Sequence, residues 1–132
     1  MMDDLIINPT RFTPKICFHY SRHILEISGE SYPENASEFY GPVFRSLAAY
    51  LDSLADQAVT MTLHLTYFNS SSSKILINLF ELLEEFAGKG KNIAVNWVCR
   101  QGDSDTREFG EEFSEDLESL TFNIVWADGS PE

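Results

Sequence analysis

A run of five polar residues, Asn69 followed by Ser70–Ser73, is the feature of this sequence with the clearest capacity for chemistry. It stands between a strand-like segment and an apolar helical pattern, with Lys74 next to it. Asparagine and serine favour the N-cap of a helix, where a side-chain oxygen accepts a hydrogen bond from an unpaired backbone N–H. Those amides and the helix dipole also stabilise an anion. The run is therefore consistent with a plain capping turn, which the local sequence favours, with a phosphorylation site, or with a site for a free anion.

Other reactive residues point away from an enzyme. The serine run lacks the glycines of a Walker-type phosphate loop, and the chain has no Gly-x-Ser-x-Gly motif. His19, His23 and His64 have no cysteine or carboxylate at metal-ligand spacing. We therefore expect no metal, no cofactor and no catalytic residue, and we treat the serines as phosphate acceptors rather than nucleophiles.

The stretch from Asp103 to Glu118 holds eight acidic residues, opposed by Arg107 alone. It lacks the alternating ligands and central glycine of a calcium loop. A solvated helix face is the first interpretation, a docking surface for a basic partner the second, and an acidic active site the third.

The overall charge narrows the class of partner. The chain of 132 residues carries 21 acidic residues against 9 Lys plus Arg, a net charge of −12. This balance disfavours nucleic acid and anionic membranes as partners. The sequence shows no signal peptide and no apolar run of the roughly 20 residues that span a bilayer. Cys17 and Cys99 lack the spacing of a redox pair, so a reducing cytoplasm is the expected location.

The first half of the chain predicts a hairpin and a helix. Residues 15–20 and 23–28 alternate apolar and polar side chains around a two-residue turn, and Gly29 closes the second strand. An apolar stripe at three- and four-residue steps then predicts a helix. Gly41-Pro42 interrupts this stripe, so we expect the main helix to begin at the proline.

Residues 58–68 give the clearest strand, with one apolar and one largely polar face, which predicts a sheet covered mainly on one side. Its odd positions, from Val59 to Tyr67, form the apolar face. After the serine run the pattern predicts a helix whose glutamates face water and a strand over residues 92–99. An acidic helix and a last strand come next. The order ββαβαβαβ predicts a single α/β domain over residues 1–132, with a mixed, mostly parallel sheet of about five strands. The acidic helix is expected to bury Phe109, Phe113 and Leu117.

Four motifs fall in a recognisable order: Ser31–Asn35, Tyr67–Lys74, Val95–Trp97 and Glu108–Glu111. Together they make the chain similar to the SiaC family of bacterial regulatory phosphoproteins, from Thr13-Pro14 to the last strand. Proteins of that family resemble anti-sigma-factor antagonists of the STAS fold. The resemblance implies a small sheet with helices on one face, which agrees with the half-covered strand.

The resemblance also implies a function. The family phosphoacceptor follows the asparagine of the motif, which places it at Ser70, with Ser71 as second choice because a fourth serine extends the run. Asn69, Ser72, Ser73 and Lys74 would form its environment. A dedicated kinase would add the phosphate, a metal-dependent serine phosphatase would remove it, and the unphosphorylated form would bind an effector such as a diguanylate cyclase.

The segment Tyr32-Pro33-Glu34-Asn35 reads locally as a turn before a helix. In a fold of this type the segment can lie at the same end of the sheet as the serine run. We therefore predict that these residues border a partner-binding surface. The alternative function is a sensor domain that binds a small molecule or anion without covalent modification.

Overall fold

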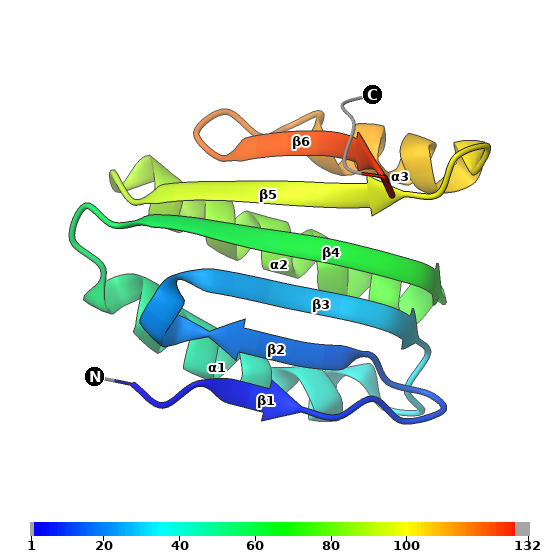
Figure 1. The fold of residues 1–132 in the computed structure, drawn as a ribbon, viewed down its shortest axis with the longest axis horizontal. Coiled ribbons are helices and arrows are strands. Elements are labelled where there is room, and N and C mark those ends of the chain that lie inside the picture. Colours follow the sequence, from blue (N-terminus) through cyan, green and yellow to red (C-terminus); the bar gives the residue numbers. More distant parts are fainter. Residues whose placement is uncertain (1, 129–132) are drawn as a thin grey trace.

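The structure, a computed structural model, describes residues 2–128 and contains a six-stranded sheet with three α-helices. In the sheet the strands lie in their chain order (Figure 1). The strands are β1 (Leu5–Ile7), β2 (Lys15–His19), β3 (Ile24–Ser31), β4 (Ala58–Phe68), β5 (Asn92–Cys99) and β6 (Thr121–Trp126). The helices are α1 (Ala36–Ser53), α2 (Ser70–Gly88) and α3 (Ser104–Ser114), with a 3-10 turn at Tyr20–Arg22.

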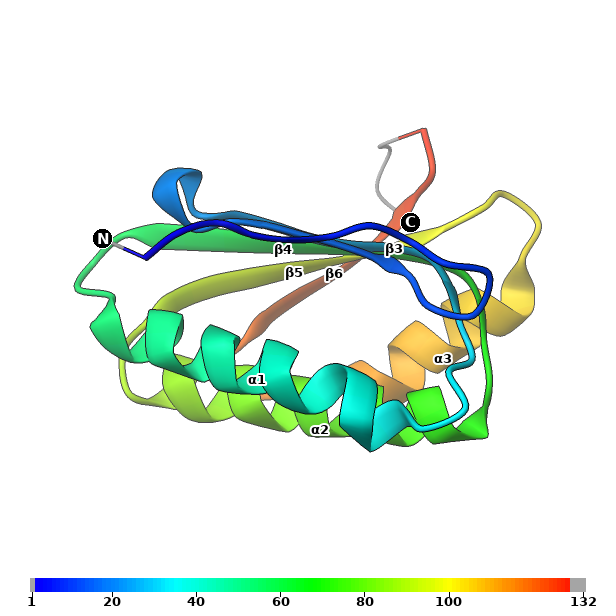
Figure 2. The ribbon, with the colours of Figure 1, turned by 90° about the horizontal axis from the view of Figure 1, so that it is seen from below.

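The topology explains why the helices share one face of the sheet. β1, β2 and β3 pair antiparallel, whereas β3 to β6 pair parallel. Each parallel connection passes through a helix, and successive crossovers of one hand in a sheet of sequential order place their helices on the same side. Figure 2 shows the three helices below the sheet and its other face uncovered. The predicted mixed α/β sheet is confirmed, with β1 as a short additional edge strand.

The core lies between that covered face and the helices. Alternate residues of the strands point into it, and the helices meet them with apolar stripes. Each fully buried aliphatic or aromatic side chain of this kind contributes about 1.5–3 kcal/mol relative to an exposed one. The fully buried members include Leu25, Ile27, Leu47, Leu51, Met61, Leu63, Leu79, Leu83 and Trp97.

The alternation predicted for β4 is wrong at its end. Leu65 pairs with Gly29 but Tyr67 pairs with Glu30, so Thr66 is an extra residue in the β3–β4 ladder. Such a bulge reverses which face the following side chains occupy. Tyr67 is therefore 52% exposed, while Phe68 packs against the buried Trp97 at a centroid distance of 6.0 Å.

Two predicted boundaries in the first half are also wrong. β3 continues through Gly29, which takes a φ of 112°, as far as Ser31. α1 begins at Ala36, capped by Asn35, and runs uninterrupted through Pro42. Pro42 is exposed, so the carbonyl that loses its helical partner there faces solvent, where water can satisfy it.

The acidic helix α3 is less buried than its sequence predicts. Phe109 is 39% exposed, Phe113 is partly buried, and Leu117 lies beyond the end of the helix. The helix instead approaches the sheet through Gly110, whose lack of a side chain makes room for the ring of Trp97. The Trp97 Nε1 donates a hydrogen bond of 2.8 Å to the carbonyl oxygen of Thr106, in the same helix.

Glu84 of α2 was expected to face water, but it organises the loop before β6. Its carboxylate accepts hydrogen bonds from the backbone N–H groups of Glu118, Ser119 and Leu120, at distances between 2.9 and 3.3 Å. These bonds, that from Leu120 foremost, lower the pKa of Glu84 because they stabilise the ionised form.

Glu84→Gln is expected to lower the free energy of unfolding by about 1 kcal/mol at neutral pH, because a neutral amide is a weaker acceptor and solvent screens the site. The contribution of the carboxylate is complete above its unfolded-state pKa and is lost as the pH falls through its lower folded-state pKa. Denaturant unfolding of both proteins should therefore show a gap that closes in acid. A gap that persists unchanged in acid would contradict the role of the charge.

Candidate functional site

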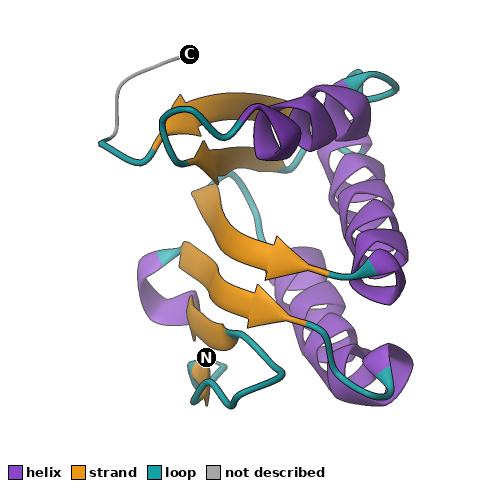
Figure 3. Cartoon of the chain, turned by 90° about the vertical axis from the view of Figure 1, so that its right-hand side faces the viewer, coloured by secondary structure: helices purple, strands orange, loops and turns teal. Residues whose placement is uncertain are grey.

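The serine run lies where β3 and β4 end side by side. Because the two strands are parallel neighbours, their carboxyl ends meet at one edge of the sheet, and the loops there lead into α1 and α2 (Figure 3). The backbone N–H of Asn69 donates a hydrogen bond of 3.2 Å to the carbonyl oxygen of Ser31, the last residue of β3. The structure thus brings the 31–35 segment and the serine run to the same end of the molecule, as predicted.

Asn69 is the N-cap of α2. Its Oδ1 accepts a hydrogen bond of 2.9 Å from the backbone N–H of Ser72, and its carbonyl oxygen accepts one of 2.9 Å from Ser73. The helix begins at Ser70, and its first turn contains no acidic residue. The positive end of the helix dipole is therefore not offset by a carboxylate within that turn.

The four serines differ in how far solvent reaches them. Ser70 and Ser71 are exposed, Ser73 is half-buried, and Ser72 is 1% exposed. A kinase or phosphatase needs a hydroxyl that it can reach, so the accessible candidates are Ser70 and Ser71. Lys74, at the end of the run, is exposed as well.

Ser72 belongs to a buried chain of hydroxyls. Its Oγ lies 2.7 Å from the Oγ of Ser31, which in turn lies 2.6 Å from the hydroxyl of Tyr40. Burial raises the pKa of Tyr40 to about 12, so the phenol stays protonated. The three hydroxyls satisfy one another and join α2, β3 and α1 beneath the exposed serines.

Sequence reasoning missed the role of Ser31 and Tyr40. Ser31 is buried at the end of β3, and Tyr40 is buried on the inward side of α1. The available signal was a polar residue at an inward position of each element, which a buried hydrogen bond must accompany.

The 31–35 segment offers less surface than expected. Tyr32 is half-buried between the rings of Phe12 and Tyr67, at centroid distances of 5.4 and 5.5 Å. Pro33 is buried, so it shapes the loop, and its predicted place at the border of a partner-binding surface stays a prediction. Glu34 and Asn35 are exposed.

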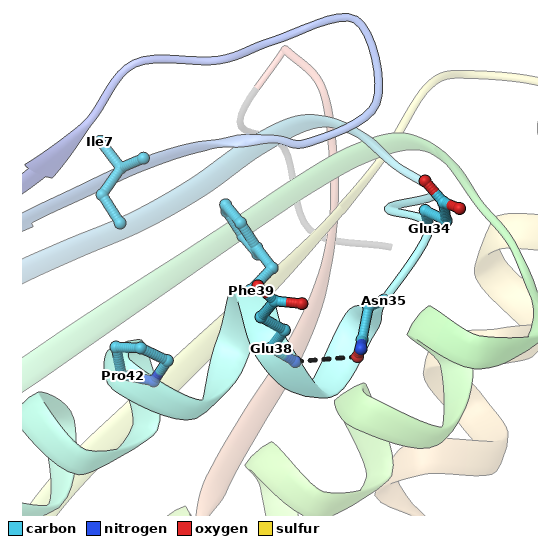
Figure 4. A pocket seen from close by; sticks show the side chains of 6 residues that line it. All are labelled: Ile7, Glu34, Asn35, Glu38, Phe39 and Pro42. Carbon is cyan, nitrogen blue, oxygen red and sulfur yellow. Dashed lines mark hydrogen bonds between the residues drawn. The ribbon is translucent and has the colours of Figure 1, made fainter.

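Asn35 also has a structural role, because its Oδ1 caps α1 by accepting a 3.0 Å hydrogen bond from the backbone N–H of Glu38 (Figure 4). Glu34 and Asn35 lie at one end of an open groove of about 930 Å³ that follows the start of α1. Its other lining residues are Ile7, Glu38, Phe39 and Pro42.

A second groove, of about 250 Å³, lies between α2 and α3 and begins at Ser73. Ile77 and Phe109 are its exposed apolar residues, at 45% and 39%. Its three charged lining residues are Glu81, Glu112 and Asp116, all acidic. The acidic stretch read from the sequence therefore forms one wall of this groove, and α2, the helix that begins with the serine run, forms the other.

The described part of the chain, residues 2–128, contains no group of three or more His, Cys, Asp or Glu side chains placed to hold a metal ion. In the same range, none of the helices combines the length and the apolar character needed to cross a membrane.

Comparison with known proteins gives one family. The model of the SiaC family of regulatory phosphoproteins matches residues 7–127. An uncharacterized protein of Pseudomonas aeruginosa (strain UCBPP-PA14) is 33% identical over 123 residues, which cover 93% of this chain and 96% of that protein.

Solved structures point to the same family. SiaC of P. aeruginosa superposes with a TM-score of 0.85 at 32% identity, covering 95% of this chain and 99% of its own. The structure of the diguanylate cyclase SiaD in complex with its activator SiaC, also from P. aeruginosa, matches with a TM-score of 0.86 at 32% identity, over 93% of this chain and 99% of that one.

Proposed function

Because the chain belongs to the SiaC family of regulatory phosphoproteins, we propose that it is a non-enzymatic protein whose unphosphorylated form binds and activates a diguanylate cyclase. The observation that carries this proposal is the likeness, over 93% of the chain, to a structure of a cyclase with its SiaC activator. That likeness favours an activator over a sensor of free anions.

The phosphoacceptor in this proposal is Ser70, with Ser71 in reserve. Both hydroxyls are exposed at the start of α2, where Asn69 fixes the turn and the first turn carries no acid. A phosphate there gains from the helix dipole, and Lys74 offsets part of its charge. A serine kinase adds the phosphate and a metal-dependent serine phosphatase removes it, both in the cytoplasm.

The switch acts through the cost of burying charge. A phosphoserine carries about −1.5 to −2 charges and three acceptor oxygens. If the cyclase covers the start of α2, an unpaired phosphate must be desolvated on binding, which is unfavourable. Phosphorylation therefore releases the cyclase without unfolding the helix.

The test combines the purified protein, before and after phosphorylation by its kinase, with the cognate diguanylate cyclase, and measures both affinity and cyclic-di-GMP synthesis. We expect the unphosphorylated protein to bind and to raise synthesis, and the phosphoprotein to do neither. Binding by both forms would refute the switch but not the partnership, and binding by neither would refute the partnership.

Tyr32→Ala is expected to weaken cyclase binding about tenfold, because tyrosine side chains contribute more to binding than most other interface residues. Titration calorimetry on the unphosphorylated protein measures the loss. Ile24→Ala is the matched control, since Ile24 is 53% exposed on the uncovered face of the sheet. Equal affinity of the Tyr32 variant and wild type would remove this residue from the interface.

A further inference from the structure

Three side chains form a hydrogen-bonded chain on the uncovered face of the sheet, away from the helices and the serine run. The Sγ of Cys17 lies 3.1 Å from the Nε2 of His19, and the Nδ1 of His19 lies 3.0 Å from the Oδ2 of Asp4. Cys17 and His19 are two residues apart in β2, so they share a face, opposite the buried Ile16 and Phe18.

These hydrogen bonds determine the tautomer of His19, that is, which ring nitrogen presents a lone pair to the thiol. A carboxylate accepts hydrogen bonds and cannot donate them, so the proton of the neutral imidazole lies on Nδ1, towards Asp4. The Nε2 lone pair then points at the Cys17 thiol and can take its proton. The hydrogen bond from His19 also lowers the pKa of Asp4, which keeps that carboxylate ionised.

Asp4 is itself held in place. Its other oxygen, Oδ1, accepts hydrogen bonds from the backbone N–H of Ser21 at 3.2 Å and from the Ser21 hydroxyl at 3.3 Å. A nucleophile, a base within hydrogen-bond reach and a third group that orients the base form the arrangement by which proteins activate thiols. Sequence spacing could not show it, because Asp4 reaches His19 only through the β1–β2 pairing.

Reagents can reach this site, whereas they cannot reach the other cysteine. Cys17 is partly exposed, and the side chains of His19 and Asp4 are 36% and 31% exposed. Cys99 is 1% exposed beneath the helices. Two other charges face Cys17: Glu26, its partner on β3, opposes thiolate formation, and Lys15, 3.9 Å from Glu26, reduces that effect.

We propose that Cys17 is a modification site, a thiol activated by His19 and Asp4 for reaction with hydrogen peroxide and similar small electrophiles. In the reaction Nε2 of His19 takes the thiol proton and the thiolate sulfur attacks one peroxide oxygen. The S–O bond forms as the O–O bond breaks, and the departing hydroxide takes the proton from His19 to leave as water. Sulfur is oxidised to the sulfenic acid and peroxide is reduced.

The test needs neither the cyclase nor the kinase, so it stands apart from the proposed function. The full chain with Cys99→Ser is treated with iodoacetamide at neutral pH, and alkylation of Cys17 is followed by mass spectrometry. We expect the folded protein to react about tenfold faster than the same protein unfolded in denaturant. Under dilute peroxide, dimedone should trap a sulfenic acid on the peptide that contains Cys17.

Two matched variants isolate the proton relay. Asp4→Asn should slow alkylation of Cys17 severalfold, whereas Asp3→Asn, which removes the same charge one residue earlier, should leave the rate unchanged. His19→Gln should bring the rate to that of the unfolded chain, with circular dichroism showing that the variant is folded. A folded protein that reacts no faster than the unfolded one, or equal rates for the two aspartate variants, would overturn the proposal.

Discussion

Ser70→Ala is expected to abolish phosphate incorporation when the protein is incubated with its kinase and ATP. Ser70 is the first residue of α2, its side chain is exposed, and it follows the asparagine that caps the helix. Asn69 makes its capping bond to Ser72 and not to Ser70, so the substitution removes the acceptor hydroxyl and leaves the cap intact. Phosphopeptide mass spectrometry measures the result.

Ser71→Ala is the matched control, because Ser71 is equally exposed in the same turn. It should retain full incorporation. If the two variants exchange behaviour, the acceptor is Ser71. If both retain the phosphate, the switch lies outside the two exposed serines and the proposed mechanism is wrong.

Gly110→Ala is expected to lower the free energy of unfolding by about 2 kcal/mol. A Cβ at this position would lie 2.5 Å from Cδ1 and 2.8 Å from Nε1 of Trp97, a ring that is 1% exposed. The alternative, displacement of α3, breaks the hydrogen bond from Trp97 to Thr106. Alanine has a higher helix propensity than glycine, which stabilises the variant by about 1 kcal/mol, so the cost of the clash must exceed that gain.

Gly88→Ala provides the comparison, since a Cβ at that helical position meets its nearest atom, the Ser119 Oγ, at an ordinary 3.8 Å. Denaturant unfolding followed by tryptophan fluorescence should leave this variant at or above wild-type stability. Equal stability of the two glycine variants would show that α3 adjusts freely and that its contact with Trp97 is not tight.

The sheet and its covered face were predictable because apolar alternation reports burial directly. β4 and β5 begin and end where their patterns do, and Val59 and Val95 point inward as expected. The order of strands and helices then limits the topology. What alternation cannot report is a shift of register. The extra residue Thr66 depends on the partner strand, so Tyr67 and Phe68 exchange faces without any local signal.

The predicted start of α1 was wrong for a different reason. Local rules disfavour a helix through Pro42, but packing of the apolar stripe on the sheet outweighs the loss of one hydrogen bond when the unpaired carbonyl faces solvent. The prediction that Glu84 only faces water was wrong because its partners, residues 118–120, are distant in sequence. A charge on an otherwise solvated helix face gives no indication that a remote loop will use it.

The candidate site was predictable in part. Local chemistry predicted a helix cap by an asparagine or serine of the run, and the structure assigns it to Asn69. The resemblance to a family selected Ser70, which remains a prediction. Neither could separate the serines by exposure, because the burial of Ser72 depends on Ser31 and Tyr40 from other elements.

The buried hydroxyl chain has a consequence for how a kinase must recognise this protein. Many kinases read a short extended peptide around the acceptor, but Ser72 ties the first turn of α2 to β3 and α1. Unwinding that turn into an extended strand would leave buried hydroxyls unpaired. A kinase that modifies Ser70 therefore has to recognise the folded surface at the end of the sheet, and specificity for its substrate rests on shape rather than on a linear motif.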